Sequence, residues 1–163
     1  MQIIYIHGLD SRPYPDRTDP LRAAGHQVLA LHLDYRRQPD TYALLHAAAA
    51  RSGAEFVIGS SLGGFLGFWL SEEAGLPCLL FNPAMQVPLQ AARIPRIRAG
   101  ACPARWVMLG AEDAVVDPQY SLQLFQHTYR APQQQVELRA GLGHQIDPAT
   151  YLAALRWCGL LST

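Results

Sequence analysis

The clearest candidate nucleophile in this 163-residue chain is a serine between two glycines. Gly59-Ser60-Ser61-Leu62-Gly63 has the form G-x-S-x-G, and the glycine spacing centres on Ser61. The motif follows a short apolar run and opens a helical pattern, which is the strand–turn–helix context of a nucleophile elbow. There Gly59 and Gly63 leave space for a sharp turn, and the hydroxyl lies at the positive end of the helix. We expect Ser61 to be a nucleophile; the alternative is a glycine-rich turn that packs a helix closely on a sheet.

A histidine near the carboxyl end is the candidate base, because an alcohol at neutral pH needs a group that accepts its proton. His144 follows Gly141-Leu142-Gly143, between the last expected strand and the last expected helix. A loop at this point lies at the same sheet edge as Ser61, and the glycines allow the ring to turn inward. The alternative is a loop histidine in contact with solvent. The histidines near helix ends or within helical patterns are interpreted as surface or packing residues: His26, His32, His46 and His127.

Three acidic residues after the expected strand 105–109 compete to orient the base. Asp117 precedes a proline and a helical pattern, so helix capping accounts for it. Glu112 has a longer side chain and is less suited to holding an imidazole at short range. Asp113 is followed by apolar residues that can anchor the turn, and we favour it over the other two. The resulting chain order, nucleophile then acid then base, is that of α/β-hydrolases.

Backbone amides near Ser61 are candidate donors to the oxyanion of a tetrahedral intermediate. The N–H of Leu62, directly after the nucleophile, is one of them. The sequence His7-Gly8-Leu9 follows the first expected strand, and a glycine there allows the backbone to turn an amide toward the site. We assign the N–H of Leu9 as the second donor, with Gly8 and His7 in supporting roles and His7 taking no part in proton transfer. The alternative is an ordinary β-to-α turn.

Short apolar runs alternate with longer helical patterns along the chain. Strands are expected at residues 2–6, 27–31, 55–58, 77–81, 105–109 and 135–138. Their nearly continuous apolar character is typical of a parallel sheet covered by helices on both faces. Helices are expected from Asp19-Pro20 to near Gly25, from Asp40 to Gly53, over 62–70 and on to Gly75, and after Asp117-Pro118 and Asp147-Pro148. This order predicts an α/β fold of about six mostly parallel strands, in a single domain over residues 1–163.

The composition argues against several classes of partner. Thirteen basic and thirteen acidic residues cancel, and no basic stripe marks a surface for nucleic acid or an anionic membrane. No apolar stretch approaches the ~20 residues that span a bilayer, and the first residues lack signal-peptide features. Cys78, Cys102 and Cys158 have neither metal nor disulfide spacing, and no nucleotide-binding glycine motif occurs. We therefore expect a cytoplasmic protein without a cofactor or a metal, whose cysteines are buried thiols.

The chain resembles the small bacterial YqiA-type esterases of the α/β-hydrolase superfamily. The likeness rests on the segments 5–11, 59–64, 81–84, 110–117 and 143–144, in that order along the chain. It implies a minimal α/β-hydrolase without a large cap domain, in which Ser61, Asp113 and His144 form the catalytic triad and short acyl esters are the substrates. It also implies that Asn82-Pro83-Ala84 lines the floor of the pocket behind the elbow.

Two departures from the family pattern bear on specificity. The family's loop usually reads His-Gly-Phe-Asn-Ser, whereas this chain has Leu9-Asp10 as the middle pair, so an added carboxylate is expected to alter which acyl groups bind. The chain is also shorter than most relatives between Pro83 and Arg105. Within that stretch, residues 86–103 follow no regular pattern and are expected to shape the acyl pocket.

The expected activity is therefore the hydrolysis of small acyl esters or thioesters through an acyl-enzyme. Lactonase and acyltransferase chemistry would use the same triad, and the residues do not separate these substrates. The alternative from a different class is a catalytically silent α/β-hydrolase fold that serves as a binding module. The expected partner is a small molecule, with no nucleic acid or membrane involved, and the sequence does not predict an oligomeric state.

Overall fold

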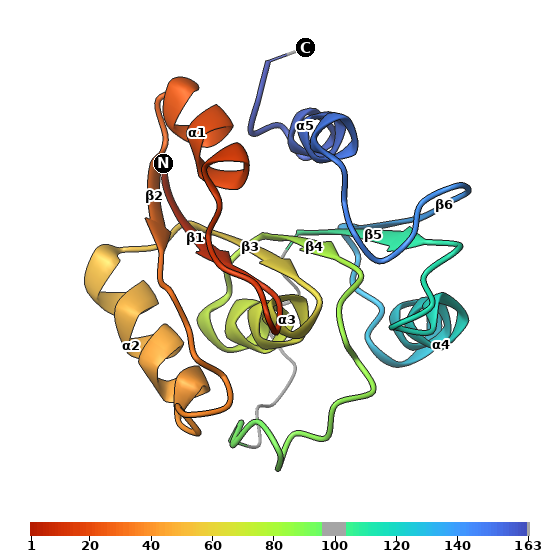
Figure 1. The fold of residues 1–163 in the computed structure, drawn as a ribbon, viewed down its shortest axis with the longest axis horizontal. Coiled ribbons are helices and arrows are strands. Elements are labelled where there is room, and N and C mark those ends of the chain that lie inside the picture. Colours follow the sequence, from red (N-terminus) through yellow and green to blue (C-terminus); the bar gives the residue numbers. More distant parts are fainter. Residues whose placement is uncertain (96–103, 163) are drawn as a thin grey trace.

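The computed structural model describes residues 1–95 and 104–162, which form one twisted central sheet with helices around it (Figure 1). In these parts of the chain, six parallel strands follow the order β2-β1-β3-β4-β5-β6. Their bounds are β1 Gln2–Ile6, β2 Gln27–Ala30, β3 Phe56–Ser60, β4 Cys78–Phe81, β5 Arg105–Gly110 and β6 Gln134–Arg139. Because all strands run the same way, the loops that follow them meet at one edge of the sheet.

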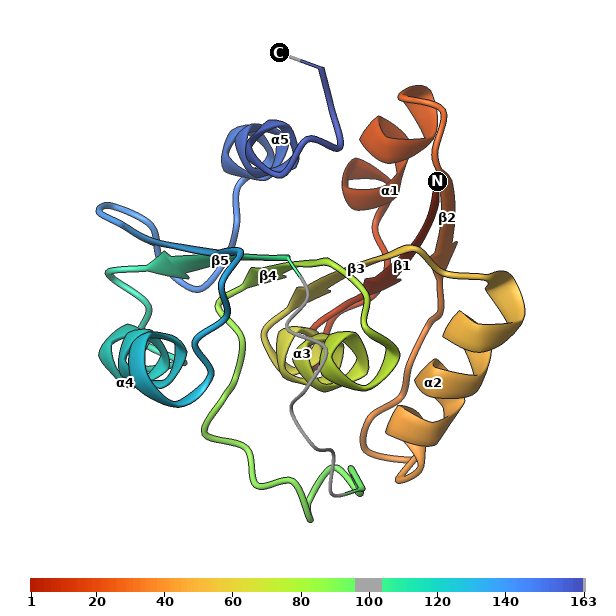
Figure 2. The ribbon, with the colours of Figure 1, turned by 180° about the vertical axis from the view of Figure 1, so that it is seen from behind.

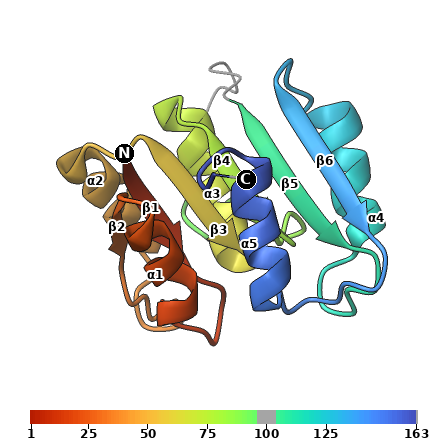
Figure 3. The same cartoon turned by 90° about the horizontal axis from the view of Figure 1, so that it is seen from above.

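Helices cover both faces of the sheet (Figures 1 and 2). Helices α1 (Pro15–Ala23) and α5 (Pro148–Trp157) lie on one face, and α5 crosses the middle strands when that face is viewed directly (Figure 3). Helices α2 (Thr41–Ser52), α3 (Leu62–Ala74) and α4 (Pro118–Gln123) lie on the opposite face. A short π-helical turn over Leu124–Thr128 continues α4.

Alternate residues of the central strands point to opposite faces of the sheet, and both sets are buried. In β1, Ile4 and Ile6 belong to the core beneath α2 and α3. Ile3 and Tyr5 belong to the core beneath α1 and α5. This burial on two sides explains why the strands read as nearly continuous apolar runs instead of alternating ones. The edge strands β2 and β6 are only partly buried.

The predicted fold class is confirmed, and each strand lies within two residues of its expected bounds. Several helix ends also follow the local signals in the sequence. Gly53 and Gly75 end their helices in the left-handed conformation, with φ values of 66° and 67°. The side chains of Asp117 and Asp147 each accept a 2.9 Å hydrogen bond from a backbone N–H in the first turn of the following helix.

The start of α1 differs from the sequence prediction. The helix begins at Pro15 and not after Asp19, so Pro20 lies inside it. Proline at the first helical position is favourable, because the N–H it lacks has no acceptor within the helix. The turn that Pro15 opens buries Thr18 on the same side as Leu21. We attribute the early start to this burial, which offsets the hydrogen bond lost at Pro20.

The expected cap of α2 is also absent. Asp40 precedes the helix, as predicted, but its side chain accepts no hydrogen bond from the helix. Its ψ of 27° lies outside the extended region that capping residues adopt. The carboxylate instead accepts a 2.7 Å hydrogen bond from Nη1 of Arg93.

Between β4 and β5 the described part of the chain, residues 82–95, forms turns without a helix or strand. The remainder of the irregular segment, residues 96–103 with Cys102, lies outside the described residues. Cys78 and Cys158 are buried free thiols, and burial raises the pKa of Cys78 to about 11. Among the helices described, none has both the length and the apolar character needed to cross a bilayer.

Candidate active site

The turn between β3 and α3 holds Ser61 in an unusual backbone conformation. Its φ is 54° and its ψ is −121°, in a region that side chains with a Cβ rarely adopt. Neighbouring segments fix it there: its N–H donates to the carbonyl of Phe81 at 2.9 Å, and its carbonyl accepts from the N–H groups of Phe65 and Ala84, both at 3.0 Å. The loop after β4 therefore holds the nucleophile candidate in place together with α3.

The glycines on both sides of Ser61 are required by close backbone contacts. A Cβ on Gly59 would lie 2.4 Å from the carbonyl oxygen of Gly63. A Cβ on Gly63 would lie 2.3 Å from the carbonyl oxygens of Ile6 and His7. Since these obstacles are backbone atoms, no side-chain rotation relieves the overlap. The two glycines thus allow the elbow to pack directly on the end of β1.

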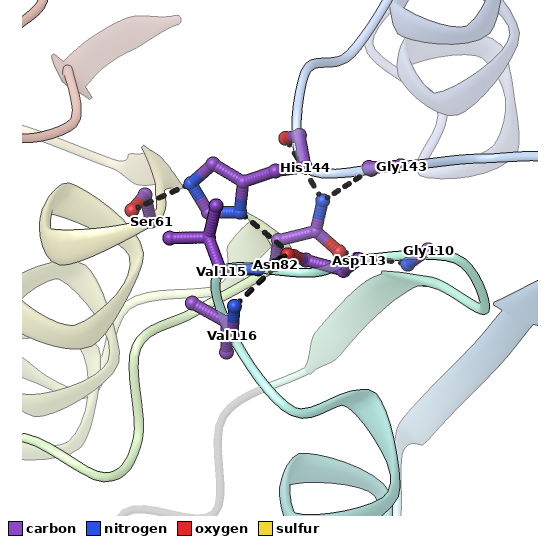
Figure 4. Close-up of polar contacts among 8 residues, drawn as sticks. All are labelled: Ser61, Asn82, Gly110, Asp113, Val115, Val116, Gly143 and His144. Atoms are coloured by element: carbon purple, nitrogen blue, oxygen red, sulfur yellow. Dashed lines mark hydrogen bonds and ion pairs between the residues drawn. The ribbon is translucent and has the colours of Figure 1, made fainter.

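The structure brings Ser61, Asp113 and His144 together from three separate loops (Figure 4). Nε2 of His144 lies 3.1 Å from Oγ of Ser61, and Nδ1 lies 2.7 Å from Oδ2 of Asp113. The carboxylate neighbour assigns the proton of neutral His144 to Nδ1, so Nε2 is free to accept the serine proton. The side chain of Asp113 is 1% exposed and that of His144 is 17% exposed, so solvent reaches the imidazole but not the carboxylate.

The second carboxylate oxygen of Asp113 is held by the turn that follows it. Oδ1 accepts hydrogen bonds from the N–H groups of Val115 at 2.7 Å and Val116 at 2.9 Å. The competing acids lie elsewhere: Asp117 caps α4, and Glu112 accepts a hydrogen bond from the N–H of Gly141. Of the three acidic residues that follow β5, Asp113 is the one that contacts the imidazole.

The loop after β1 is braced by His7. Its Nδ1–H donates to the carbonyl of Gly8 at 2.8 Å, and its Nε2 accepts from the N–H of Leu33 at 2.9 Å. Its own carbonyl accepts a hydrogen bond from the hydroxyl of Tyr35. Burial lowers the pKa of His7 below its usual value, which favours the neutral ring that these two bonds require. His7 thus joins the end of β1 to the segment after β2.

Two backbone amides near Ser61 have no acceptor among the described residues, those of Leu9 and Leu62. Leu62 is the first residue of α3, where an N–H has no partner within the helix. The loop that carries Leu9 lies against Ser61, since a Cβ on Gly8 would be 3.2 Å from Cβ of Ser61. Both predicted oxyanion donors therefore lie on segments that border the Ser61 hydroxyl.

Asn82, directly after β4, makes a set of contacts that the sequence did not predict. The resemblance implied that it lines the pocket floor, but it is 1% exposed and borders neither cavity described below. Its Nδ2 donates to the carbonyls of Gly143 and His144, both at 3.0 Å, and its Oδ1 accepts from the N–H of Gly110 at 2.7 Å (Figure 4). Ala84, two residues later, does line a cavity.

Two cavities meet at Ser61, which they share with Leu9 and Val115. The larger has a volume of about 690 Å³ and extends toward α1 and α5; its walls include Tyr5, Asp16, Arg17, His144 and Tyr151. The smaller has a volume of about 390 Å³ and extends toward α2 and α3; its walls include Leu62, Leu66, Ala84, Val87, Ala91 and Val116. The start of the irregular segment thus borders the smaller cavity, as expected for a segment that shapes the pocket.

The arrangement is suited to proton transfer from an alcohol to an imidazole beside a buried carboxylate, which is the chemistry of acyl transfer. No group of three His, Cys, Asp or Glu side chains within residues 1–95 and 104–162 is placed to bind a metal ion.

The sequence profile of the uncharacterised protein family UPF0227, the YqiA-type family, matches residues 2–94 of the chain. This match covers more than half of the sequence and includes the loop after β1 and the elbow. No curated protein matches the sequence.

Solved structures of α/β-hydrolases are similar to the fold. A putative hydrolase of the α/β superfamily from Xanthomonas campestris superposes with a TM-score of 0.70 at 18% identity, covering 95% of this chain and 92% of that one. SOBER1 from Arabidopsis thaliana gives 0.69 at 15% identity, with 96% of each chain covered. Esterase PE8 gives 0.67 at 15% identity, covering 98% and 92%. At these identities the likeness establishes the α/β-hydrolase fold and nothing beyond it.

Proposed function

The chain belongs to the uncharacterised protein family UPF0227, and from that premise and the geometry around Ser61 we propose that it is a serine hydrolase that cleaves small acyl esters or thioesters. The entire chain would act as one α/β-hydrolase domain. The observation that carries the proposal is the continuous line from the Ser61 hydroxyl through the His144 ring to the buried Asp113 carboxylate, with separations of 3.1 and 2.7 Å.

The first half of the reaction forms an acyl-enzyme. Nε2 of His144 accepts the hydroxyl proton while Oγ of Ser61 bonds to the substrate carbonyl carbon. The carbonyl oxygen becomes an oxyanion, which accepts hydrogen bonds from the N–H groups of Leu9 and Leu62. Asp113 stabilises the imidazolium. When the bond to the leaving oxygen or sulfur breaks, Nε2 returns the proton to the leaving group.

The second half releases the acid. Water takes the place of the leaving group and gives a proton to Nε2 of His144 as its oxygen bonds to the acyl carbon. The bond to Oγ of Ser61 then breaks, and the proton returns to that oxygen. No proton or electron is gained or lost over the cycle, and the net reaction consumes one water. The esterase PE8 among similar folds and the hydrolase superfamily of the Xanthomonas protein support this reaction class.

Labelling with a fluorescent fluorophosphonate tests the assignment. The native protein should form a covalent adduct at Ser61, and Ser61→Ala should form none. Ser60→Ala is the matched control, because it removes the neighbouring hydroxyl and should still be labelled. Equal labelling of native protein and Ser61→Ala would refute the nucleophile, and a folded native protein that neither reacts nor hydrolyses nitrophenyl esters or acyl-thioesters would favour the silent binding module.

A further inference from the structure

His144 distinguishes the two cavities that meet at Ser61, because it lines the larger cavity and not the smaller. In the proposed reaction the leaving oxygen takes its proton from Nε2 of this residue. The leaving group must therefore lie on the side of the larger cavity. The acyl group then extends into the smaller cavity, whose walls are mainly aliphatic, among them Leu62, Leu66 and Ala84.

Tyr5 presents a hydroxyl without a protein partner to the larger cavity. Tyr5 is 5% exposed and lines the cavity, and its hydroxyl makes no hydrogen bond to any described residue. Burial raises the pKa of Tyr5 to about 12, so the hydroxyl keeps its proton at neutral pH. Arg17 lowers this pKa and Asp16 raises it, which means that both charges act on the same hydroxyl. The protonated Tyr5 hydroxyl can therefore both donate a hydrogen bond to a bound group and accept one from it.

The carboxylates that line this cavity each lie near a guanidinium group. Nη2 of Arg17 lies 3.8 Å from Oδ2 of Asp16, and Oδ2 of Asp10 accepts a 2.9 Å hydrogen bond from Nη2 of Arg36. The guanidinium of Arg17 also lies over the ring of Tyr151, 4.9 Å from its centroid. The cavity thus offers donors, acceptors and an aromatic wall without an excess of either charge. Hydroxyl groups, which both donate and accept, suit these walls better than an ion does.

We propose that the leaving group is a small neutral polyol, of the glycerol or sugar class, bound in the larger cavity beside Tyr5 and Asp16, while an apolar acyl chain occupies the smaller cavity. This proposal rests on the proposed function. A charged alcohol would find no excess of opposite charge among these side chains, and a purely apolar alcohol would cover the Tyr5 hydroxyl without offering it a partner.

Two esters with the same acyl group test the polyol. The substrates are 1-butyrylglycerol and propyl butyrate, which share the acyl chain and the three-carbon alcohol and differ in two hydroxyls. The native protein should have the higher kcat/KM for the glycerol ester, and Tyr5→Phe should lower the ratio of the two kcat/KM values about fivefold, the effect of one neutral hydrogen bond. The matched control is Tyr42→Phe, whose hydroxyl contacts Glu73 away from both cavities.

The outcomes separate this proposal from the one on which it rests. A native ratio at or below one would overturn the polyol, and so would a ratio that Tyr5→Phe leaves unchanged. If the native protein hydrolyses neither ester nor any other acyl substrate, the proposed hydrolase function fails instead.

The contacts of Asn82, which borders neither cavity, indicate a second functional role. Its side-chain amide joins the loop of the base to the loop of the acid. Nδ2 donates hydrogen bonds to the carbonyls of Gly143 and His144, and Oδ1 accepts one from the N–H of Gly110. The adjacent carbonyl of Phe81 accepts the N–H of Ser61. Asn82 is buried and its φ of 42° suits asparagine better than most residues. We infer that Asn82 is a positioning residue that sets the distance between His144 and its two partners.

Removing the amide should affect turnover more than substrate binding. In Asn82→Ala we expect kcat to fall about 100-fold, as for a misplaced catalytic group, with KM nearly unchanged. The downfield NMR signal of the His144 Nδ1–H should shift or broaden. Asn82→Asp should behave similarly, because a carboxylate keeps an oxygen near Gly110 but loses both donors to the base loop.

Ser71→Ala is the matched control, since it removes a buried hydroxyl that donates to the carbonyl of Leu76 near the far end of α3. This variant should lose stability and retain both kcat and the NMR signal. If Asn82→Ala, corrected for its folded fraction, matches Ser71→Ala in kcat and in the His144 signal, the positioning role is wrong and Asn82 is only structural.

Discussion

Oδ2 of Asp113 lies 2.7 Å from Nδ1 of His144, and the same carboxylate is 1% exposed. Replacement by asparagine keeps the size of the side chain but can present an N–H₂ group to the ring, which favours the wrong tautomer of the imidazole. In Asp113→Asn we expect kcat for a nitrophenyl ester to fall about 10⁴-fold, with little change in the thermal midpoint. The comparison variant is Asp117→Ala, which should lose about 1 kcal/mol of stability through its cap and keep most activity. If Asp117→Ala were the inactive variant and Asp113→Asn the active one, Asp117 and not Asp113 would be the acid that orients His144.

The neutral ring of His7 makes the stability of the folded protein depend on pH below neutrality. Because burial lowers the pKa of His7 in the folded state, the unfolded chain takes up a proton first as the pH falls through about 6.5. The contribution of His7 to stability is therefore complete above pH 6.5 and decreases below it. Urea unfolding at pH 7.5, 6.5 and 5.5 should show a larger loss of unfolding free energy in the native protein than in His7→Gln. Parallel curves for the two proteins would contradict this account.

The tight contact between the elbow and β1 predicts that Gly63 tolerates no side chain. In Gly63→Ala the new Cβ would lie 2.3 Å from two backbone oxygens, so the turn must move or the protein must unfold. We expect loss of ester hydrolysis and a thermal midpoint lowered by many degrees. Gly67→Ala, one turn further along α3, meets a side-chain atom of Val57 at 3.1 Å and should be much milder. Calorimetry of both variants is the measurement, and equal midpoints would be inconsistent with the packing described.

A buried ion pair at the other end of the sheet should matter for stability but not for turnover. Arg105 and Glu72 are 2% and 4% exposed, and Nη1 of the arginine also donates to the carbonyl of Tyr129 at 2.7 Å. Glu72→Ala leaves the guanidinium unpaired and should cost about 3–5 kcal/mol, while kcat per folded molecule is retained. Asp19→Ala removes an exposed pair and should cost at most about 1 kcal/mol. Urea unfolding measures the free energy of unfolding, and active-site titration gives the kcat per folded molecule.

The features that follow from local signals were predictable from the sequence. Strand positions follow from apolar runs, the ends of α2 and α3 from Gly53 and Gly75, and the elbow from glycines around Ser61. Proximity of Ser61 and His144 followed from a general property of parallel sheets, whose loops meet at one edge. Each of these inferences needed only a short stretch of chain and a rule of topology.

The remaining features depend on contacts between distant segments. The bridge through Asn82 exists because β4 lies between β3 and β5, an adjacency that a local pattern does not contain. An asparagine directly after a strand was the available signal, since this residue tolerates positive φ. Likewise, the early start of α1 depends on burial of Thr18, and the pairing of Asp40 with Arg93 spans 53 residues.

The separation of the reactive groups along the chain has a consequence for biosynthesis. The serine and its base are 83 residues apart, and the base and acid are 31 apart. During translation the amino-terminal strands emerge and collapse long before the loop of His144 is made. Under the proposed function, a nascent chain on the ribosome therefore carries the elbow without a proton acceptor until the loop of His144 has been made. Ribosome-bound intermediates should therefore escape phosphonate probes that capture the finished molecule.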